Sequence, residues 1–497
     1  MKINRYIKQT IFAIAVLALS GSCKKDFLEK SPTSFINVDD YGYTSTRNPA
    51  VLNATLDGVY TTLFDMWTGG TERHDDFGQK GWDIYTDFLS GDLALSVSTY
   101  GWYRRLVNYD ATTDYARAEN YMPWRYYYKI IKSTNVIIDA LTANGAPTTD
   151  SGKAGLGQAK ALRAYAYFYL SQLYITEYDP ASKVLPLYDD PTQVAEPKAT
   201  TEDIYNLMIT DLTDAIDLLN GFTRTNKIKI NQDVAKGLLA YVYASMDTPA
   251  NNQKAKDLAE EIIATGTYPI MNSTEVVGGF NDASTPGWMW GVDITTDNGL
   301  DLVSWWGQMD VFTYSYQWAG DVKSIDEDLF NSITANDVRK TQFYTDPNSS
   351  YYLIPFNKFY DSNRSIGGQR EITTDYVFMR IAEFYLLSAE MSAKLGQDID
   401  ARNRLKDLLA QRFAAAADYA YVDALSGVAL QDEIYLQTRI ELFAEGKSYL
   451  ALKRNKKTVH RGPNHLYQAG IDVLYNDPRL TFEIPLSEVQ NNPNLDN

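Results

Sequence analysis

The sequence predicts a mainly α protein in which paired helices form a tetratricopeptide-like α/α superhelix with long irregular loop insertions. Apolar and aromatic residues recur every three or four positions over Ala159–Tyr174, the spacing of a helix with one buried face. Ala235–Tyr243 (AKGLLAYVY) matches Ala159–Tyr167 (AKALRAYAY) at six of nine positions, 76 residues further on, near twice the length of one such repeat. This spacing is lost over residues 268–370, a stretch too long for an ordinary connection and typical of a functional loop.

The other helices follow from the same spacing in chain order. Thr200 is placed as an N-cap with Asp203 at the third helical position, and Gly221 ends that helix. Residues 65–114 are predicted as loops with short helices, and Gly145–Gly157 as a break. The predicted helices are Pro49–Phe64, Trp124–Leu141, Ala159–Tyr174, Thr200–Leu219, Asn231–Met246, Gln253–Ala264, Asp375–Leu395, Asp400–Ala416 and Gln431–Arg454.

Charged residues recur within the later helices. Their spacing is that of helix contacts, so we expect them to tie helices together rather than to bind a ligand. They are Glu383, Glu390, Arg439, Glu441 and Glu445.

Overall charge limits the kind of ligand. The formal net charge is −17, and removal of an N-terminal leader with three basic residues and no acid makes it −20. So negative a chain argues against nucleic-acid binding, which needs a basic face, and suits a neutral ligand. The 37 Tyr and 9 Trp supply aromatic faces of the kind that pack against sugar rings.

The N-terminus has the pattern of an export signal. Basic residues precede the apolar run Ile11–Leu19, which is too short to span a bilayer permanently. Leu19-Ser20-Gly21-Ser22-Cys23 resembles the lipobox of bacterial lipoproteins, although Ser20 stands where Leu is usual. The resemblance implies a signal peptide over residues 1–22, lipid attachment at Cys23 and a tether over residues 23–46. An ordinary secreted protein with a free thiol is the alternative.

Seven ordered segments together resemble the SusD/RagB family of surface lipoproteins. The resemblance covers essentially the whole mature chain, with Lys447 where the family often has Arg and Asp496 where Gln is usual. The segments are Cys23–Leu28, Trp124–Asn135 (WRYYYKIIKSTN), Lys160–Tyr174, Glu202–Leu219, Arg380–Glu390 (RIAEFYLLSAE), Arg439–Arg454 (RIELFAEGKSYLALKR), and Ile484–Glu488 with Asn492–Leu495.

The resemblance implies four tetratricopeptide-like helix pairs and a binding protein rather than an enzyme, with no cofactor. Members of the family lie on the outer face of the outer membrane and deliver glycans, less often peptides, to a TonB-dependent transporter of the SusC type. It also implies a helical repeat region at 47–267 and a C-terminal region at 268–497, with a ligand-binding loop insertion at 268–370.

Two loop regions without helical spacing carry the candidate ligand site, Thr71–Arg105 and Gly287–Asp321. A sugar needs flat aromatic platforms for its C–H faces and polar groups for its hydroxyl rim, and both occur here. For each Trp a role in the core is the alternative, and Trp290, in a short strand-like pattern, is expected in the core. The predicted glycan-binding residues are His74, Asp76, Trp82, Trp102, Trp305, Trp306, Tyr314, Tyr316 and Trp318.

Other functions are supported less well. The acidic doublets Asp75-Asp76 and Asp189-Asp190 leave a surface glycoside hydrolase as an alternative. A repeat scaffold that binds only peptides or a protein partner is another. No metal site is predicted, because the three histidines form no His-Glu-x-x-His motif and Cys23 is assigned to lipid. A phosphate-binding loop motif is absent as well.

Overall fold

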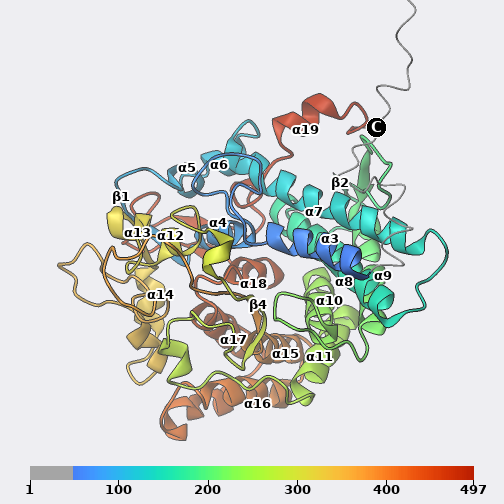
Figure 1. Ribbon diagram of the computed structural model, residues 1–497. Helices are drawn as coiled ribbons and strands as arrows, with labels where there is room; N and C mark the ends of the chain where they lie inside the picture. The colour runs from blue at the N-terminus through green and yellow to red at the C-terminus, as the bar shows by residue number, and fades with distance from the viewer. Residues whose placement is uncertain (1–48, 497) are drawn as a thin grey trace, which may run out of the picture.

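The computed structural model describes residues 49–496 and confirms the mainly α, tetratricopeptide-like fold. Successive helices pack side by side from α7 to α16, and the row runs from the upper right to the bottom of Figure 1. Its members are α7 (Ala118–Thr142), α8 (Asp150–Tyr174), α9 (Thr201–Leu218), α10 (Gln232–Met246), α11 (Pro249–Ala264), α15 (Ala382–Lys394) and α16 (Asp398–Leu409). The short helix α3 (Pro49–Thr62) packs on α7 and α8.

The central helix is longer than predicted. α8 begins at Asp150, within the segment Gly145–Gly157 that the sequence predicts as a break. Glycine serves close packing there: a Cβ on Gly155 would lie 2.6 Å from Leu52 of α3. The N-cap of α9 is as predicted, since Thr200 and Asp203 form a reciprocal capping box.

All three predicted helices near the C-terminus are wrong in part. The helix predicted over Asp400–Ala416 ends at Leu409, in α16. Asp375–Leu395 contains a strand, β6 (Tyr376–Arg380), which pairs antiparallel with β4 (Trp288–Val292) before α15 begins. Gln431–Arg454 is divided into α17 (Gly427–Glu441) and α18 (Ser448–Arg454). The chain turns between them because Ala444 and Gly446 have positive φ, 58° and 74°.

The loop insertion 268–370 contains only short elements, as its lost periodicity predicts. They are η2 (Glu275–Val277), β4, η3 (Thr296–Asn298), α12 (Trp306–Met309), α13 (Tyr316–Ala319), β5 (Asp321–Ile325), α14 (Glu327–Ser332) and η4 (Val338–Gln342). β5 pairs antiparallel with β1 (Leu93–Ser98) and so joins the insertion to the first loop region. The prediction that Trp290 belongs to a buried strand is confirmed, since it is 2% exposed in β4.

Residues 65–114 hold one helix of three turns, α4 (Gln79–Ser90), which is buried along its whole length. The remaining elements of the described chain are short: α5 (Arg104–Val107), α6 (Asp110–Thr113), β2 (Lys183–Pro186), β3 (Lys198–Thr200), η5 (Ala416–Ala424), β7 (Val459–His460), β8 (Asp472–Val473), η6 (Pro478–Leu480) and α19 (Leu486–Asn491).

A buried ion network fastens the insertion to the helices. The carboxylate of Glu441 in α17 forms ion pairs with Arg380 Nη1 at 2.6 Å, Arg412 Nη2 at 2.7 Å and Arg339 Nη1 at 3.1 Å. Its neighbour Glu445 receives Lys358 Nζ at 2.8 Å. These guanidinium and ammonium groups hold the pKa of both carboxyls low despite burial, that of Glu445 at about 2.

The prediction that the charged residues of the helices tie elements together is confirmed. Arg454 Nη2 lies 2.9 Å from Glu390 Oε2, and Arg439 Nη2 lies 2.6 Å from Asp92 Oδ1. Tyr241 Oη donates to Glu383 Oε2 at 2.6 Å. In each contact the two partners come from separate segments, and Asp92 lies in the link between α4 and β1.

The predicted signal peptide, Cys23 and the tether to residue 46 lie outside the described residues, and the boundary at 267/268 remains a prediction. Within residues 49–496, no helix has the length and apolar character needed to cross a membrane.

Candidate functional site

Three of the predicted platform tryptophans lie in the core. Trp82, Trp305 and Trp306 are 0%, 2% and 1% exposed. Trp82 packs edge-on against Tyr85 at 5.4 Å, and Trp305 packs edge-on against Trp306 at 4.9 Å. Their prediction as ligand platforms is therefore wrong, because no ring face is open to a ligand; the alternative stated for each, a role in the core, holds.

Asp76 is also corrected, since it is fully buried. Its carboxylate accepts hydrogen bonds from Gly69 N at 2.6 Å, Thr71 N at 2.9 Å and Thr71 Oγ1 at 2.9 Å. These bonds fix the turn over residues 69–76. The neighbouring Asp75 is buried too and accepts hydrogen bonds from Arg73 Nε and Tyr85 Oη. This acidic doublet therefore presents no open pair of carboxylates.

The other predicted aromatic residues come together with one further tyrosine. We call Tyr100, Trp102, Tyr314, Tyr316 and Trp318 the aromatic surface. The ring centroid of Tyr316 lies 5.5 Å from those of both Tyr100 and Trp102. Tyr314 and Trp318 lie 5.5 Å from each other at 46°. Rings from two loop regions over 200 residues apart thus come into contact, Tyr316 with Tyr100 and Trp102, as the sequence predicts.

The rings differ in how much they expose. Tyr100 is 62% exposed, and Tyr314 and Trp318 are 38% exposed each. Trp102 is half-buried, because the His74 ring stacks on it at 5.4 Å and 7°. Tyr316 is 8% exposed, and its hydroxyl lies 2.7 Å from His74 Nδ1. His74 and Tyr316 therefore support the surface, while Tyr100, Tyr314 and Trp318 offer it to a ligand.

Sequence reasoning missed Tyr100, although it lies within the singled-out stretch Thr71–Arg105. A signal existed: Gly101 follows it, and its φ of 86° is a conformation that favours glycine and is typical of a turn. Arg73 and Arg370 were missed as well. Arg73 Cζ lies 5.3 Å from the Trp102 ring centre, and Arg370 Cζ lies 5.3 Å from that of Tyr314.

A buried carboxylate holds the first loop in place. Asp321 Oδ1 accepts from Thr99 N at 2.7 Å, Tyr100 N at 2.8 Å and Gly101 N at 3.3 Å, and Oδ2 accepts from Trp102 N at 3.2 Å. Asp321 opens β5, directly after α13, which carries Trp318. This one side chain thus holds the loop of Tyr100 and Trp102 against β5, next to the pairing of β1 with β5.

Below it, Lys323 is buried and donates to the carbonyls of Gln308 and Asp321, both at 2.9 Å. Burial lowers the pKa of this amine to about 7. Trp318 has a support of its own, because its indole packs on the backbone of Gly367. A Cβ added to Gly367 would lie 2.4 Å from the indole. The rings are therefore fixed before any ligand arrives.

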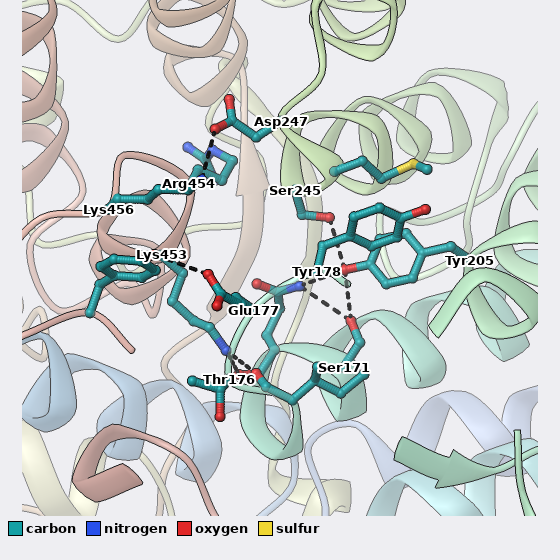
Figure 2. A pocket seen from close by; sticks show the side chains of 14 residues that line it. Ser171, Thr176, Glu177, Tyr178, Tyr205, Ser245, Asp247, Lys453, Arg454 and Lys456 are labelled. Atoms are coloured by element: carbon teal, nitrogen blue, oxygen red, sulfur yellow. Dashed lines mark hydrogen bonds and ion pairs between the residues drawn. The ribbon is translucent and has the colours of Figure 1, made fainter. Parts of the chain in front are cut away.

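A separate cavity of about 80 Å³ lies between α8, α9, α10 and α18 (Figure 2). Its polar groups largely satisfy one another. Lys453 Nζ donates to the carbonyl of Gln172 at 2.7 Å and caps the end of α8, and Ser245 Oγ donates to Tyr205 Oη at 3.1 Å. None of the predicted site residues lines this cavity. The hydrogen bonds of its lining residues connect the surrounding helices.

No group of three or more His, Cys, Asp or Glu residues within 49–496 is arranged to hold a metal ion. The aromatic surface is an arrangement that can bind a ligand: rings on a loop face, carried by a stack of paired helices. Fold and surface together define a helical-repeat binding protein.

Comparison with protein families identifies which one. A family described as starch-binding and associating with the outer membrane matches residues 26–244, and the SusD family matches residues 308–497. The two matches together cover most of the chain, which belongs to the SusD/RagB family. The resemblance inferred from the seven sequence segments is confirmed.

Solved structures agree on the fold. A SusD-like carbohydrate-binding protein from Bacteroides vulgatus is 25% identical over 90% of this chain and 97% of that one, with a TM-score of 0.73. A SusD superfamily protein from Bacteroides thetaiotaomicron is 22% identical over 93% and 99%, with a TM-score of 0.73. Surface glycan-binding protein A from the same species, solved with laminarihexaose, is 15% identical over 89% and 97%, with a TM-score of 0.66. A search of curated proteins finds no match.

Proposed function

We propose that the protein is a cell-surface lipoprotein that captures an oligosaccharide on the aromatic surface and passes it to a SusC-like TonB-dependent transporter. The observation that carries the proposal is the set of open, fixed rings of Tyr100, Tyr314 and Trp318. A pyranose ring has C–H faces that pack on such rings, and Arg370 beside Tyr314 can donate to hydroxyls at the rim.

Family and chemistry support a glycan over other ligands. The family is described as starch-binding, and a relative of the same fold was solved with laminarihexaose. The charge of Arg370 beside the surface is already paired with Asp301 at 2.7 Å, which suits a neutral ligand. In this proposal the protein binds the glycan and does not hydrolyse it.

Attachment and transfer complete the proposal. Lipid on Cys23 would hold the chain at the outer membrane, since several acyl chains together give a stable anchor. The aromatic surface would then lie over the mouth of the transporter, which takes the cargo inward. Deleting the transporter should leave glycan binding by the purified protein unchanged and abolish uptake by cells; uptake that persists without the transporter would contradict the transfer step.

Binding is tested by calorimetry with a panel of neutral oligosaccharides. Trp318→Ala and Tyr314→Ala should each weaken binding about tenfold, because each removes a stacking ring, and the pair should weaken it further. Tyr421→Ala is the matched control, since Tyr421 is 41% exposed on η5, outside the aromatic surface. Unchanged affinity in all aromatic-surface variants would refute the assignment. Sugars released during the same incubations would indicate hydrolysis instead.

A further inference from the structure

A second aromatic hollow lies on the helical side of the molecule. It has a volume of about 270 Å³ and is bounded by α7, the segment 188–195 and α19; we call it the α7 hollow. Figure 1 shows α7 and α19 at the upper right of the molecule and α13, which carries Trp318, at the far left. The α7 hollow is therefore separate from the aromatic surface.

Three aromatic rings line the α7 hollow; Trp124 is buried at 4% exposure, so the partly exposed Tyr128 and Tyr188 are the rings that a ligand can reach. Trp124 and Tyr128 have centroids 4.7 Å apart, and Tyr188 meets Tyr128 edge-on at 5.7 Å and 89°. Tyr128 Oη donates to Pro186 O at 2.8 Å, and Tyr188 Oη accepts from Glu196 N at 3.2 Å. Because both phenol hydroxyls are tied to backbone, the rings need no ordering when a ligand binds.

Polar side chains form the rim, and Gln193 and Glu488 are held there through one atom each. Gln193 Oε1 accepts from Asp189 N at 2.8 Å and Asp190 N at 3.0 Å, which leaves its amide N–H groups pointing away from those contacts. Glu488 Oε1 accepts from Asn492 Nδ2 at 2.8 Å. Lys132 is exposed and has no ion-pair partner within residues 49–496. The rim therefore has donors and acceptors to offer a ligand.

The charge and size of the α7 hollow narrow the ligand class. Its rim holds the carboxylates of Asp190 and Glu488 against the single ammonium of Lys132, a balance that disfavours an anion. Its volume lies just below the range of about 300–1,000 Å³ for sites of drug-sized ligands, which suits the end of a short glycan. Aromatic walls with a mixed polar rim match the C–H faces and hydroxyl edge of a sugar.

We propose that the α7 hollow is a second binding site for neutral oligosaccharides. It does not depend on the site at the aromatic surface, although both take the same chemical class. Two sites on one chain can hold one polysaccharide at two points, which raises the retention of long chains over short ones without any new contact.

The test is isothermal calorimetry and saturation-transfer NMR with laminarihexaose, maltohexaose, cellohexaose, xylohexaose and mannohexaose. At least one of these should bind with two sites per chain. The Trp318→Ala, Tyr314→Ala double variant should retain one site, located in the α7 hollow. Adding Tyr188→Ala to that variant should weaken the retained site at least tenfold.

Exposed variants guard against misfolding. Lys132→Ala with Gln193→Ala changes only rim side chains and should weaken the retained site at least threefold, whereas Lys153→Ala, an exposed lysine on α8 outside the hollow, should leave it unchanged. One site per chain, lost on changing Trp318 and Tyr314, would overturn the second site alone. Binding only at the α7 hollow would overturn the proposed capture site alone. No binding by any glycan, or binding of peptides only at the hollow, would overturn the inference.

Discussion

The loop insertion 268–370 has one part with buried charged side chains and another with exposed aromatic side chains. At one end Arg339 and Lys358 are 1% and 0% exposed and enter the ion network around Glu441 and Glu445. At the other end Tyr314 and Trp318 are both 38% exposed. The comparison shows how a segment without long helices or large sheets is held rigidly: charges pointing inward fix it, so its aromatic rings need not all be buried.

The largest effect is expected where three arginines share one carboxylate. Glu441→Ala should lower the free energy of unfolding by about 5 kcal/mol, because it leaves buried guanidinium groups without their partner. Chemical denaturation measures this. Asp301→Ala removes the partner of Arg370, a pair whose side chains are 38% and 67% exposed, and should cost less than about 1 kcal/mol. Equal losses in the two variants would break the comparison between the two ends.

The same contrast exists between tryptophans twelve residues apart in the sequence. Trp306→Ala should cost about 4 kcal/mol, because it opens a cavity in the core and removes the indole hydrogen bond to Asp375 O at 3.2 Å. Trp318→Ala should change stability by less than about 1 kcal/mol and weaken glycan binding instead. Thermal unfolding and calorimetry on both variants separate the two roles. A stable Trp306→Ala variant with weakened binding would reverse our correction.

That pair also shows what the sequence could predict. Helical spacing located the helix pairs and the unpatterned insertion, because burial of one helix face leaves a periodic trace. Residues 305–306 and 314–318 carry no such trace, since both are aromatic residues in irregular chain. Which rings are buried depends on contacts such as that of Trp305 with Phe359, 54 residues away in the sequence, at 4.7 Å.

Two boundary errors have the same origin. Glycine in α8 suggested a turn, but Gly155 permits the approach of Leu52 from another helix. Tyr376–Arg380 continued an apolar run into α15, yet it forms a strand because its partner β4 lies within the insertion. Short apolar runs do not distinguish strand from helix without the partner. Tyr100 was not predicted for a related reason. Its exposure depends on Asp321 in β5, which holds the loop although it is distant in the sequence.

Acid should weaken the anchoring of the insertion through Glu445. The pKa of Glu445 falls from 4.5 to about 2 on folding, so its stabilising contribution is present above pH 4.5 and is lost as the pH falls toward 2. That shift corresponds to roughly 3 kcal/mol. Denaturation between pH 6 and 2.5 measures the loss, and Glu445→Gln should flatten the profile in this range. An unchanged profile in that variant would place the acid sensitivity elsewhere.

A smaller change in stability is expected at Gly367, which packs against Trp318. Gly367→Ala places a Cβ against the Trp318 indole and forces alanine to φ 61°, so stability should fall by about 1 kcal/mol. Glycan binding should weaken severalfold, because the indole must move from its position beside Tyr314. Gly299→Ala is the matched control: its φ is 62°, but nothing lies within 4 Å of the added Cβ. It should cost similar stability and leave binding unchanged. Equal binding in both variants would mean that the precise position of Trp318 does not matter to the ligand.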